Sequence, residues 1–279
     1  MTDLTRREFN SLTMAGIVSA FAPYKGVTLG VQSYSFRDRA LPPAIEAMAK
    51  IGIASCELWQ GHVEPSAVAR DELRKWRETV SLSVFHKIAE AFARPKIEIT
   101  AYNISFKDDF SDAEIERGFD MAEALGTKVI TASANVAAVP RVARVAARRK
   151  VPVGMHNHST IAPDEFATPE SLTHAAEAEG GFIRINLDIG HFTAANFDAV
   201  DFLRTHHERI VSLHIKDRTR DQGDNVPFGR GQTPIGPVLR LLRDERWNIP
   251  ANIEYEYKGA DAIDEVKKCF DFCRRQLDA

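Results

Sequence analysis

Two histidines stand two residues apart at the end of a short apolar run, in the stretch VPVGMHNHS over residues 151–159. Residues i and i+2 of a β-strand project from the same face, so His156 and His158 are predicted to point in one direction. Imidazoles act as metal ligands, as acid/base groups or as hydrogen-bonded structural residues. Their common face predicts a functional site there; a histidine that only packs or bonds to a neighbouring strand is the alternative.

Other apolar runs of the sequence also end in polar groups that can do chemistry. These groups are Glu57, Trp59 and His62 in and after 53–59, Asp188 and His191 at the end of 182–188, His214, Lys216 and Asp217 at the end of 210–216, and Glu254 and Glu256 in 251–257. Imidazoles and carboxylates that converge form the ligand set of a divalent cation such as Mn, Co, Zn or Mg, and nitrogen ligands favour the transition metals over Mg. The recurrence at several strand ends predicts one divalent metal site.

The elements that must position these groups are short β-rich runs alternating with helix-like segments. Eight runs have strand character: 27–34, 53–59, 97–104, 128–133, 151–156, 182–188, 210–216 and 251–257. Strand followed by helix, repeated eight times, predicts a single-domain (β/α)8 TIM barrel over residues 23–279, with its site at the carboxyl ends of the strands. An open doubly wound sheet is the alternative, but it needs a glycine-rich phosphate turn after the first strand, which this sequence lacks.

Helix start signals lie between the strand-like runs. Ser111 with Glu114 three residues later forms a capping-box pattern, and Gly126 follows as a stop signal. Thr168 before Pro169 predicts a second helix start, with Gly180 and Gly181 beyond it as the expected end. These signals support helical crossovers between parallel strands.

Composition restricts the class of function. The chain has 279 residues, 44% of them hydrophobic and 27% charged, with a formal net charge of -3. This is enough apolar sequence for one large hydrophobic core. The slightly negative net charge does not indicate a basic surface of the kind that binds nucleic acids, so no nucleic-acid partner is expected. The three cysteines, Cys56, Cys269 and Cys273, lack zinc-finger spacing and predict neither a disulfide framework nor a cysteine metal site.

The first 22 residues read differently from the rest. Arg6 and Arg7 precede an apolar run and the small-residue stretch AFA just before Pro23. This order predicts a twin-arginine signal peptide over residues 1–22, and hence a periplasmic or secreted protein; an amphipathic first helix is the alternative. The run is shorter than the ~20 residues that cross a bilayer, so no membrane span is expected.

Four motifs, LDIGH, LHIKDRTR, PFGRGQTPIG and NIEYEY, occur in that order with strand–helix spacing. With them the sequence resembles the xylose isomerase-like TIM-barrel superfamily of sugar isomerases and epimerases. The resemblance implies Asp188, His214 and Glu254 as metal ligands. In the epimerases the fourth ligand is a glutamate at the end of strand five, a place held here by His156, which becomes the fourth predicted ligand.

The resemblance also implies a reaction. Isomerases and epimerases of this kind remove a proton next to a carbonyl, and a divalent metal stabilises the resulting enediolate. From its place on the same strand face as His156, His158 is predicted to meet the substrate as an acid/base group or hydrogen-bond donor, and Glu254 is predicted as a catalytic residue besides its ligand role. The predicted substrate contacts are Glu57, Trp59, His62, His191, Lys216 and Arg220.

Because His156 replaces one of the paired glutamates, a one-faced reaction is an alternative to epimerisation: isomerisation, or elimination by a metal-dependent lyase or hydratase acting on keto-sugars or keto-glycosides. A non-catalytic sugar-binding barrel belongs to another class. An apurinic endonuclease shares the barrel but needs three zinc ions and a basic groove, which the charge disfavours. The expected partner is a small sugar or sugar derivative, and a homo-oligomer is compatible with the sequence.

Overall fold

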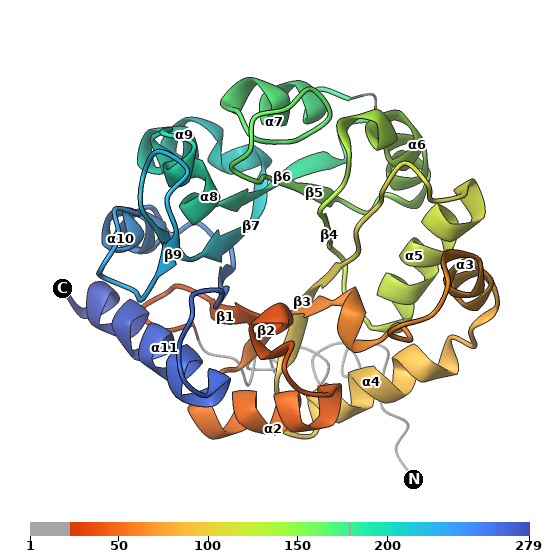
Figure 1. The fold of residues 1–279 in the computed structure, drawn as a ribbon, viewed down its shortest axis with the longest axis horizontal. Coiled ribbons are helices and arrows are strands. Elements are labelled where there is room, and N and C mark those ends of the chain that lie inside the picture. Colours follow the sequence, from red (N-terminus) through yellow and green to blue (C-terminus); the bar gives the residue numbers. More distant parts are fainter. Residues whose placement is uncertain (1–22, 179) are drawn as a thin grey trace, which may run out of the picture.

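Eight parallel strands close into a barrel in the computed structural model, which describes residues 23–178 and 180–279. The predicted signal peptide lies outside these residues. The strands are β1 (Leu29–Gln32), β2 (Ser55–Trp59), β3 (Glu98–Asn103), β4 (Ile130–Ala132), β5 (Val153–His156), β6 (Ile183–Asp188), β7 (Ile210–Ile215) and β10 (Ala251–Ile253). They follow one another around the ring in chain order, with β10 closing onto β1 (Figure 1). The predicted TIM barrel is confirmed.

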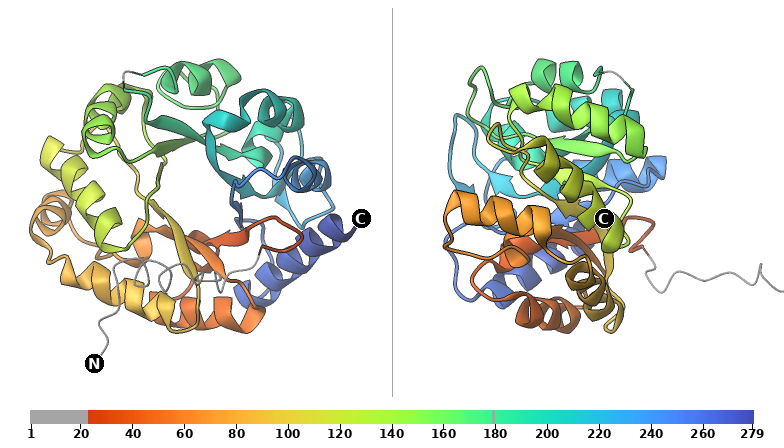
Figure 2. Two further views of the ribbon diagram at one scale, coloured as in Figure 1. Left: turned by 180° about the vertical axis from the view of Figure 1, so that it is seen from behind. Right: turned by 90° about the vertical axis from the view of Figure 1, so that its right-hand side faces the viewer.

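Helices surround the strands on all sides (Figures 1 and 2). They are α2 (Leu41–Ile51), α3 (Arg70–Thr79), α4 (Ser83–Ala93), α5 (Asp112–Ala124), α6 (Val139–Arg149), α7 (Pro169–Ala175), α8 (Ile189–Ala194), α9 (Ala199–His206), α10 (Ile235–Glu245) and α11 (Ala262–Asp278). Short 3-10 turns, η1 (Ser33–Phe36), η2 (Gln60–His62), η3 (Val136–Ala138) and η4 (His207–Arg209), adjoin them. Within the described part of the chain, no helix is both long and apolar enough to cross a membrane.

The helix start signals are found where they were expected. Ser111 caps α5, accepting a hydrogen bond from the Glu114 amide while the Glu114 side chain accepts from the Ser111 amide. Thr168 caps α7, whose first residue is Pro169. The end of α7 differs from the prediction, because the helix stops at Ala175, well before the two glycines.

Strand register sets the level of the site. Asp188 lies opposite His214 in the β6–β7 pair, and His156 lies opposite Asn186 in the β5–β6 pair. β10 ends at Ile253, so Glu254 follows directly after its strand rather than within a longer one. Because the strands are parallel, their carboxyl ends meet at one mouth of the barrel, which brings these side chains together.

A small hairpin after β7 was not expected. It pairs β8 (Asp217–Arg218) with β9 (Asn225–Val226). The Asp217 carboxylate accepts hydrogen bonds from the backbone amides of Gly229, Gly231 and Thr233, at 2.8, 3.0 and 3.2 Å. Gly229 has φ +85°, a backbone conformation that side chains other than glycine rarely adopt. The glycine-rich segment therefore wraps around Asp217.

Candidate metal centre

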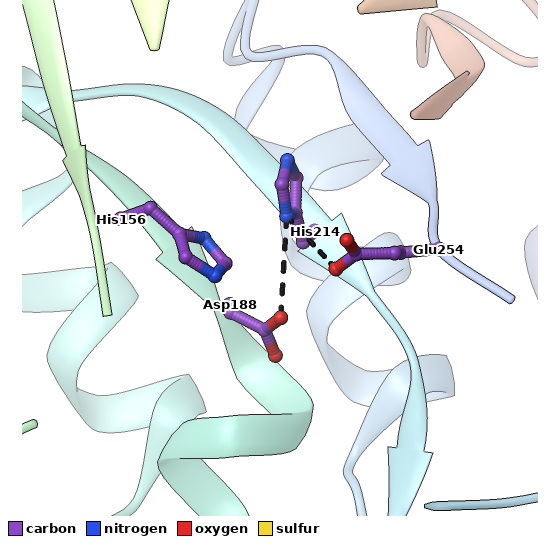
Figure 3. Close-up of side chains that lie close together, drawn as sticks. All are labelled: His156, Asp188, His214 and Glu254. Atoms are coloured by element: carbon purple, nitrogen blue, oxygen red, sulfur yellow. Dashed lines mark ion pairs between the residues drawn. The ribbon is translucent and has the colours of Figure 1, made fainter. Parts of the chain in front are cut away.

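Four buried side chains converge at the mouth of the barrel: His156, Asp188, His214 and Glu254 (Figure 3). They come from the ends of β5, β6, β7 and β10, which are consecutive around the ring. Each offers one ligand atom, and these atoms all lie within 4.8 Å of one another. The set is the one predicted from the sequence.

Each of these residues has one buried polar atom without a hydrogen-bond partner among the described residues. The atoms are His156 Nδ1, Asp188 Oδ2, His214 Nδ1 and Glu254 Oε2. An unsatisfied buried polar group costs about 1–3 kcal/mol, and more when it is charged, so four together mark a missing partner. Two imidazole nitrogens and two carboxylate oxygens suit a divalent ion such as Zn, Mn or Co. The residues therefore fit one divalent cation.

Lys216 supplies the positive charge nearest to the two carboxylates. Its Nζ lies 3.0 Å from Asp188 Oδ2 and 2.8 Å from Glu254 Oε2, ion pairs that lack hydrogen-bond geometry, and it is also paired with Glu256. Burial lowers the pKa of Lys216, but the surrounding carboxylates outweigh it and raise the pKa. A Cβ at Gly190 would overlap the Lys216 stem, so the glycine of the LDIGH motif makes room for this side chain.

The pKa values of the two candidate carboxylate ligands, Asp188 and Glu254, are shifted in opposite directions. Burial raises the pKa of Asp188 to about 6 against the opposing charge of Lys216. Burial also acts to raise the pKa of Glu254, but Lys216 and then His214 outweigh it and bring the pKa well below its usual range. One carboxylate is thus ionised over a wide pH range, while the other competes with a proton near neutrality.

The pKa values of the two candidate histidine ligands are also shifted in opposite directions. Burial, followed by the neighbouring His214, lowers the pKa of His156 well below its ordinary value. Burial also lowers the pKa of His214, but Glu57 and Glu254 outweigh it and raise that pKa. A neutral His156 keeps a lone pair free for a metal, whereas metal binding at His214 has to displace a proton.

His158 faces the same cavity and lies two residues after the candidate ligand His156. Its Nδ1 lies 3.0 Å from Glu165 Oε2, and its Nε2 lies 3.1 Å from Ser133 Oγ. Since a carboxylate only accepts, Nδ1 carries the proton and Nε2 presents a lone pair. Both His156 and His158 line a cavity of about 350 Å³, so the predicted common face is found.

The residue between the two histidines has a separate role that sequence reasoning missed. Asn157 is fully buried, and its side-chain amide bridges to β6. Its Oδ1 accepts from the Asp188 amide at 2.8 Å, and its Nδ2 donates to the Asp188 carbonyl at 3.1 Å. Asn157 thus extends the β5–β6 pairing past the strand end and holds the backbone of Asp188, a candidate metal ligand.

The predicted substrate contacts have different positions. Trp59, His191 and Lys216 line the cavity. His62 lies behind Trp59, with its ring nitrogens 2.9 Å from Ser33 Oγ and 3.2 Å from the Phe36 carbonyl. These contacts occupy both nitrogens of His62, which does not line the cavity.

Two other predicted contacts also lie off the cavity wall. Glu57 is fully buried beneath the site, and its carboxylate is turned toward His214. Arg220 is exposed, and the arginine near the site is Arg218, whose Nη1 lies 2.6 Å from His191 Nδ1. Arg218 stands one residue after LHIKD, and its buried position in the hairpin was not visible from spacing alone.

The rest of the cavity wall comes from strands without metal ligands. The additional lining residues are Gln32, Tyr34, Asn103, Ser105 and Ser133. They lie at or just beyond the ends of β1, β3 and β4. These residues lie at strand ends just as the candidate ligands do. Because their side chains are neutral and common at such positions, the sequence alone gave no reason to select them.

A profile of the family described as xylose isomerase-like TIM barrel matches residues 45–276. No curated protein matches the sequence significantly. Among solved structures, the probable 3-DHS dehydratase AsbF involved in petrobactin synthesis from Bacillus anthracis is 17% identical, with a TM-score of 0.67 over 91% of this chain and 99% of that one.

Two further solved structures share the fold. The 3-keto-D-glucoside 4-epimerase YcjR from E. coli is 14% identical, with a TM-score of 0.67 over 89% of this chain and 99% of that one. The IOLI protein, solved with a zinc atom, is 16% identical, with a TM-score of 0.65 over 90% of this chain and 98% of that one. At these identities the likeness supports the fold alone.

Proposed function

This chain belongs to the xylose isomerase-like TIM barrel family, and from that premise we propose that it is a divalent-metal-dependent enzyme of the sugar isomerase and epimerase type. The reaction begins with removal of a proton next to a carbonyl. The observation that carries the proposal is the convergence of four buried ligand atoms that lack a hydrogen-bond partner in the described structure, beside a cavity that an oriented histidine also faces. A sugar-binding barrel without chemistry has no need of both features.

Metal and protein supply different parts of the chemistry. His156, Asp188, His214 and Glu254 would hold the ion, which would supply Lewis-acid chemistry that makes the C–H next to a carbonyl easier to deprotonate. His158 takes the proton through Nε2, because Glu165 holds Nδ1–H and leaves the lone pair turned to the cavity. A general base placed in this way contributes about 10²–10⁴ in rate.

The cavity favours an unphosphorylated sugar. Among its described lining residues, Lys216 alone carries a permanent positive charge, and that ammonium is already paired with Asp188, Glu254 and Glu256. A phosphate would find no unpaired cation among these lining residues and would meet the Glu256 carboxylate. Tyr34 and Trp59, in edge-to-face contact with centroids 4.9 Å apart, offer aromatic surface to the apolar side of a sugar ring. The keto-glucoside named for YcjR is a substrate of this neutral kind.

A second candidate is elimination on a keto-sugar or keto-glycoside by a lyase or hydratase. Epimerisation needs bases on two faces of the substrate, but both carboxylates on the β10 side, Glu254 and Glu256, are paired with Lys216. Of the two described cavity histidines that are not candidate ligands, His191 has a cation next to each ring nitrogen, whereas His158 is oriented by a carboxylate and is the better base. A single base suits isomerisation or β-elimination, and the dehydratase named for AsbF is an elimination enzyme.

The test of the proposal joins metal content to proton exchange. Purified protein is expected to bind one divalent ion per chain, measured by elemental analysis after dialysis against Mn, Co, Zn or Mg. Free, phosphorylated and 3-keto sugars are then incubated with each metal form in D2O and followed by NMR. Exchange of a C–H next to the carbonyl of an unphosphorylated sugar supports the proposal. Metal binding without exchange or product for any sugar in the panel contradicts it.

We also propose that the protein is exported by the twin-arginine route. The support is the order of Arg6, Arg7, the apolar run and the AFA stretch before Pro23. Replacing both arginines with lysine is expected to trap the precursor in the cytoplasm. N-terminal sequencing of the fractionated protein is the measurement, and a mature chain that begins at Met1 or Thr2 contradicts the proposal.

A further inference from the structure

One carboxylate inside the barrel has an unusual number of donors around it. Glu57 of β2 is fully buried, below the level of the cavity. Five side chains from four other strands place a donor atom within hydrogen-bond distance of its two oxygens: Gln32, Thr131, Ser212, His214 and Asn252. TIM barrels normally fill this region with branched apolar side chains. A polar cluster here therefore calls for an explanation other than packing.

The shortest of these contacts reaches a proposed metal ligand. His214 Nε2 lies 2.7 Å from Glu57 Oε1. The other four side chains all donate to Glu57, which therefore acts as an acceptor in this cluster. An acceptor oxygen 2.7 Å from His214 Nε2 requires a ring proton on that nitrogen. Nδ1 then lies on the opposite side of the ring, where Asp188 Oδ2 and Glu254 Oε2 are 4.0 and 3.1 Å away (Figure 3). Loss of the proton from Nδ1 leaves a lone pair there for a metal.

A neighbouring amide is consistent with the same proton position. Asn186 Nδ2 lies 3.1 Å from His214 Nε2, where two donors would face each other. Turning the amide by 180° brings Asn186 Oδ1 to the Nε2–H instead, and this oxygen is buried without a partner in the described structure. Amide oxygen and nitrogen are assigned from the hydrogen-bond network, and this network favours the turned amide.

We propose that Glu57 is a positioning residue: it holds His214 in the tautomer and orientation that present Nδ1 to the metal, and it does not touch substrate. This inference rests on the proposed function, since it takes His214 as a ligand. It reassigns a side chain that the sequence predicted as a substrate contact. A carboxylate behind a ligating imidazole fixes the ring and makes it a stronger donor, and removing such a partner typically weakens metal binding 10–100-fold.

The test begins with the parent protein by NMR. Long-range 1H–15N correlation of the histidine rings is expected to place a proton on His214 Nε2 in the metal-free protein. After zinc loading that proton is expected to remain, with Nδ1 unprotonated. A proton on Nδ1 and none on Nε2, in either spectrum, overturns the inference. The metal-free spectrum tests the position of the His214 proton even if the protein binds no metal. Absence of metal binding would contradict the proposed function, but it would not change the outcome of this spectrum.

The second arm measures zinc affinity by isothermal titration in two variants. Glu57→Gln keeps the shape but removes the charge, and its zinc Kd is expected to rise 10–100-fold. Ser212→Ala is the matched control, because it removes a donor to the other oxygen, at 3.0 Å, and leaves the histidine contact in place. A parent-like Kd in Glu57→Gln, or an equal loss in Ser212→Ala, overturns the inference. If Glu57→Gln does not fold, the two parent spectra decide alone.

Discussion

The two halves of the barrel mouth differ in charge. The charged half, built by β5, β6, β7 and β10, carries the four candidate ligands together with Lys216 and Glu256. The neutral half, built by β1, β2, β3 and β4, lines the same cavity with Gln32, Tyr34, Trp59, Asn103 and Ser133. Both halves use the same strand-end positions, so the difference comes from side-chain chemistry and not from the backbone.

This division assigns the halves different tasks. Charges placed close together need counter-charges, and in the charged half each buried carboxylate has Lys216 or a histidine beside it. The neutral half offers amide, hydroxyl and aromatic groups, which bind sugar hydroxyls and ring faces without adding charge. Glu57 belongs to β2 but turns beneath the cavity to His214, so it serves the charged half. We therefore expect metal affinity to depend on one half and sugar affinity on the other.

The largest expected effect comes from removing a ligand in the charged half. Asp188→Asn, His214→Ala and Glu254→Gln each delete one of four donor groups, and each is expected to abolish stoichiometric binding of one divalent ion and the activity that depends on it. Ser133→Ala in the neutral half is the matched control and is expected to bind metal like the parent. Elemental analysis after dialysis is the measurement. Parent-like metal content in all three ligand variants would show that the ion, if any, binds elsewhere.

The next effect separates the two histidines of the opening motif. His156→Ala is expected to lower metal occupancy and activity together, because it removes a ligand. His158→Ala is expected to keep the metal and lose about 10²–10⁴ in turnover, as for a lost general base. Glu165→Gln is expected to lower turnover less, since it only disturbs the ring that it holds at 3.0 Å. If His158→Ala loses the metal and His156→Ala keeps it, the two roles have to be exchanged.

A smaller and graded effect is expected from pH. Burial raises the pKa of Asp188 from 3.8 to about 6. In the metal-free protein the folded carboxyl holds its proton more tightly than the unfolded one, so its contribution to stability is present below pH 3.8 and is lost as the pH rises through about 6. Metal binding has the opposite sign, because it needs the carboxylate: protonation of Asp188 alone is expected to lower the affinity by up to about tenfold per pH unit below about 6. The proton that metal binding displaces from His214 adds a further fall with decreasing pH, which Asp188→Asn retains.

Two measurements check this pH dependence. Isothermal titration with zinc on both sides of pH 6 gives the slope of the affinity. Urea unfolding of metal-free parent and Asp188→Asn over the same range isolates the contribution of the carboxyl, because asparagine does not titrate. Identical pH dependence of the unfolding free energy in the two proteins would show that Asp188 is not the titrating group.

The smallest effect is expected in the neutral half. Trp59→Ala removes the aromatic surface opposite the charged half and is expected to raise KM for the sugar by about 2–13-fold, from about 0.5–1.5 kcal/mol of lost ring contact, with metal affinity unchanged. Steady-state kinetics and zinc titration on the same preparation provide the two readouts. A large loss of metal binding in Trp59→Ala would contradict the expectation that metal affinity depends on the charged half alone.

Much of this protein was determined by local sequence alone. Alternating apolar runs and capped helices specify strands and helices through short-range rules, and eight repeats close a barrel, as β1–β10 pairing confirms. The candidate ligands His156, Asp188, His214 and Glu254 were predictable because each follows an apolar run, and parallel strands carry all such positions to one mouth. Period-two alternation likewise put His156 and His158 on one face.

Only the tertiary structure decided what the remaining polar residues do, because their partners come from distant strands. Glu57 and His214 are 157 positions apart, and no spacing rule predicts that their side chains meet inside the barrel. The same holds for the bridge from Asn157 to β6 and for the contact of His158 with Ser133 at the end of β4. Arg220 was selected by its distance from His214 along the chain, yet the hairpin after β7 turns it outward and buries Arg218 instead. Local rules predict which face of an element a side chain lies on, but its contacts depend on how the whole barrel closes.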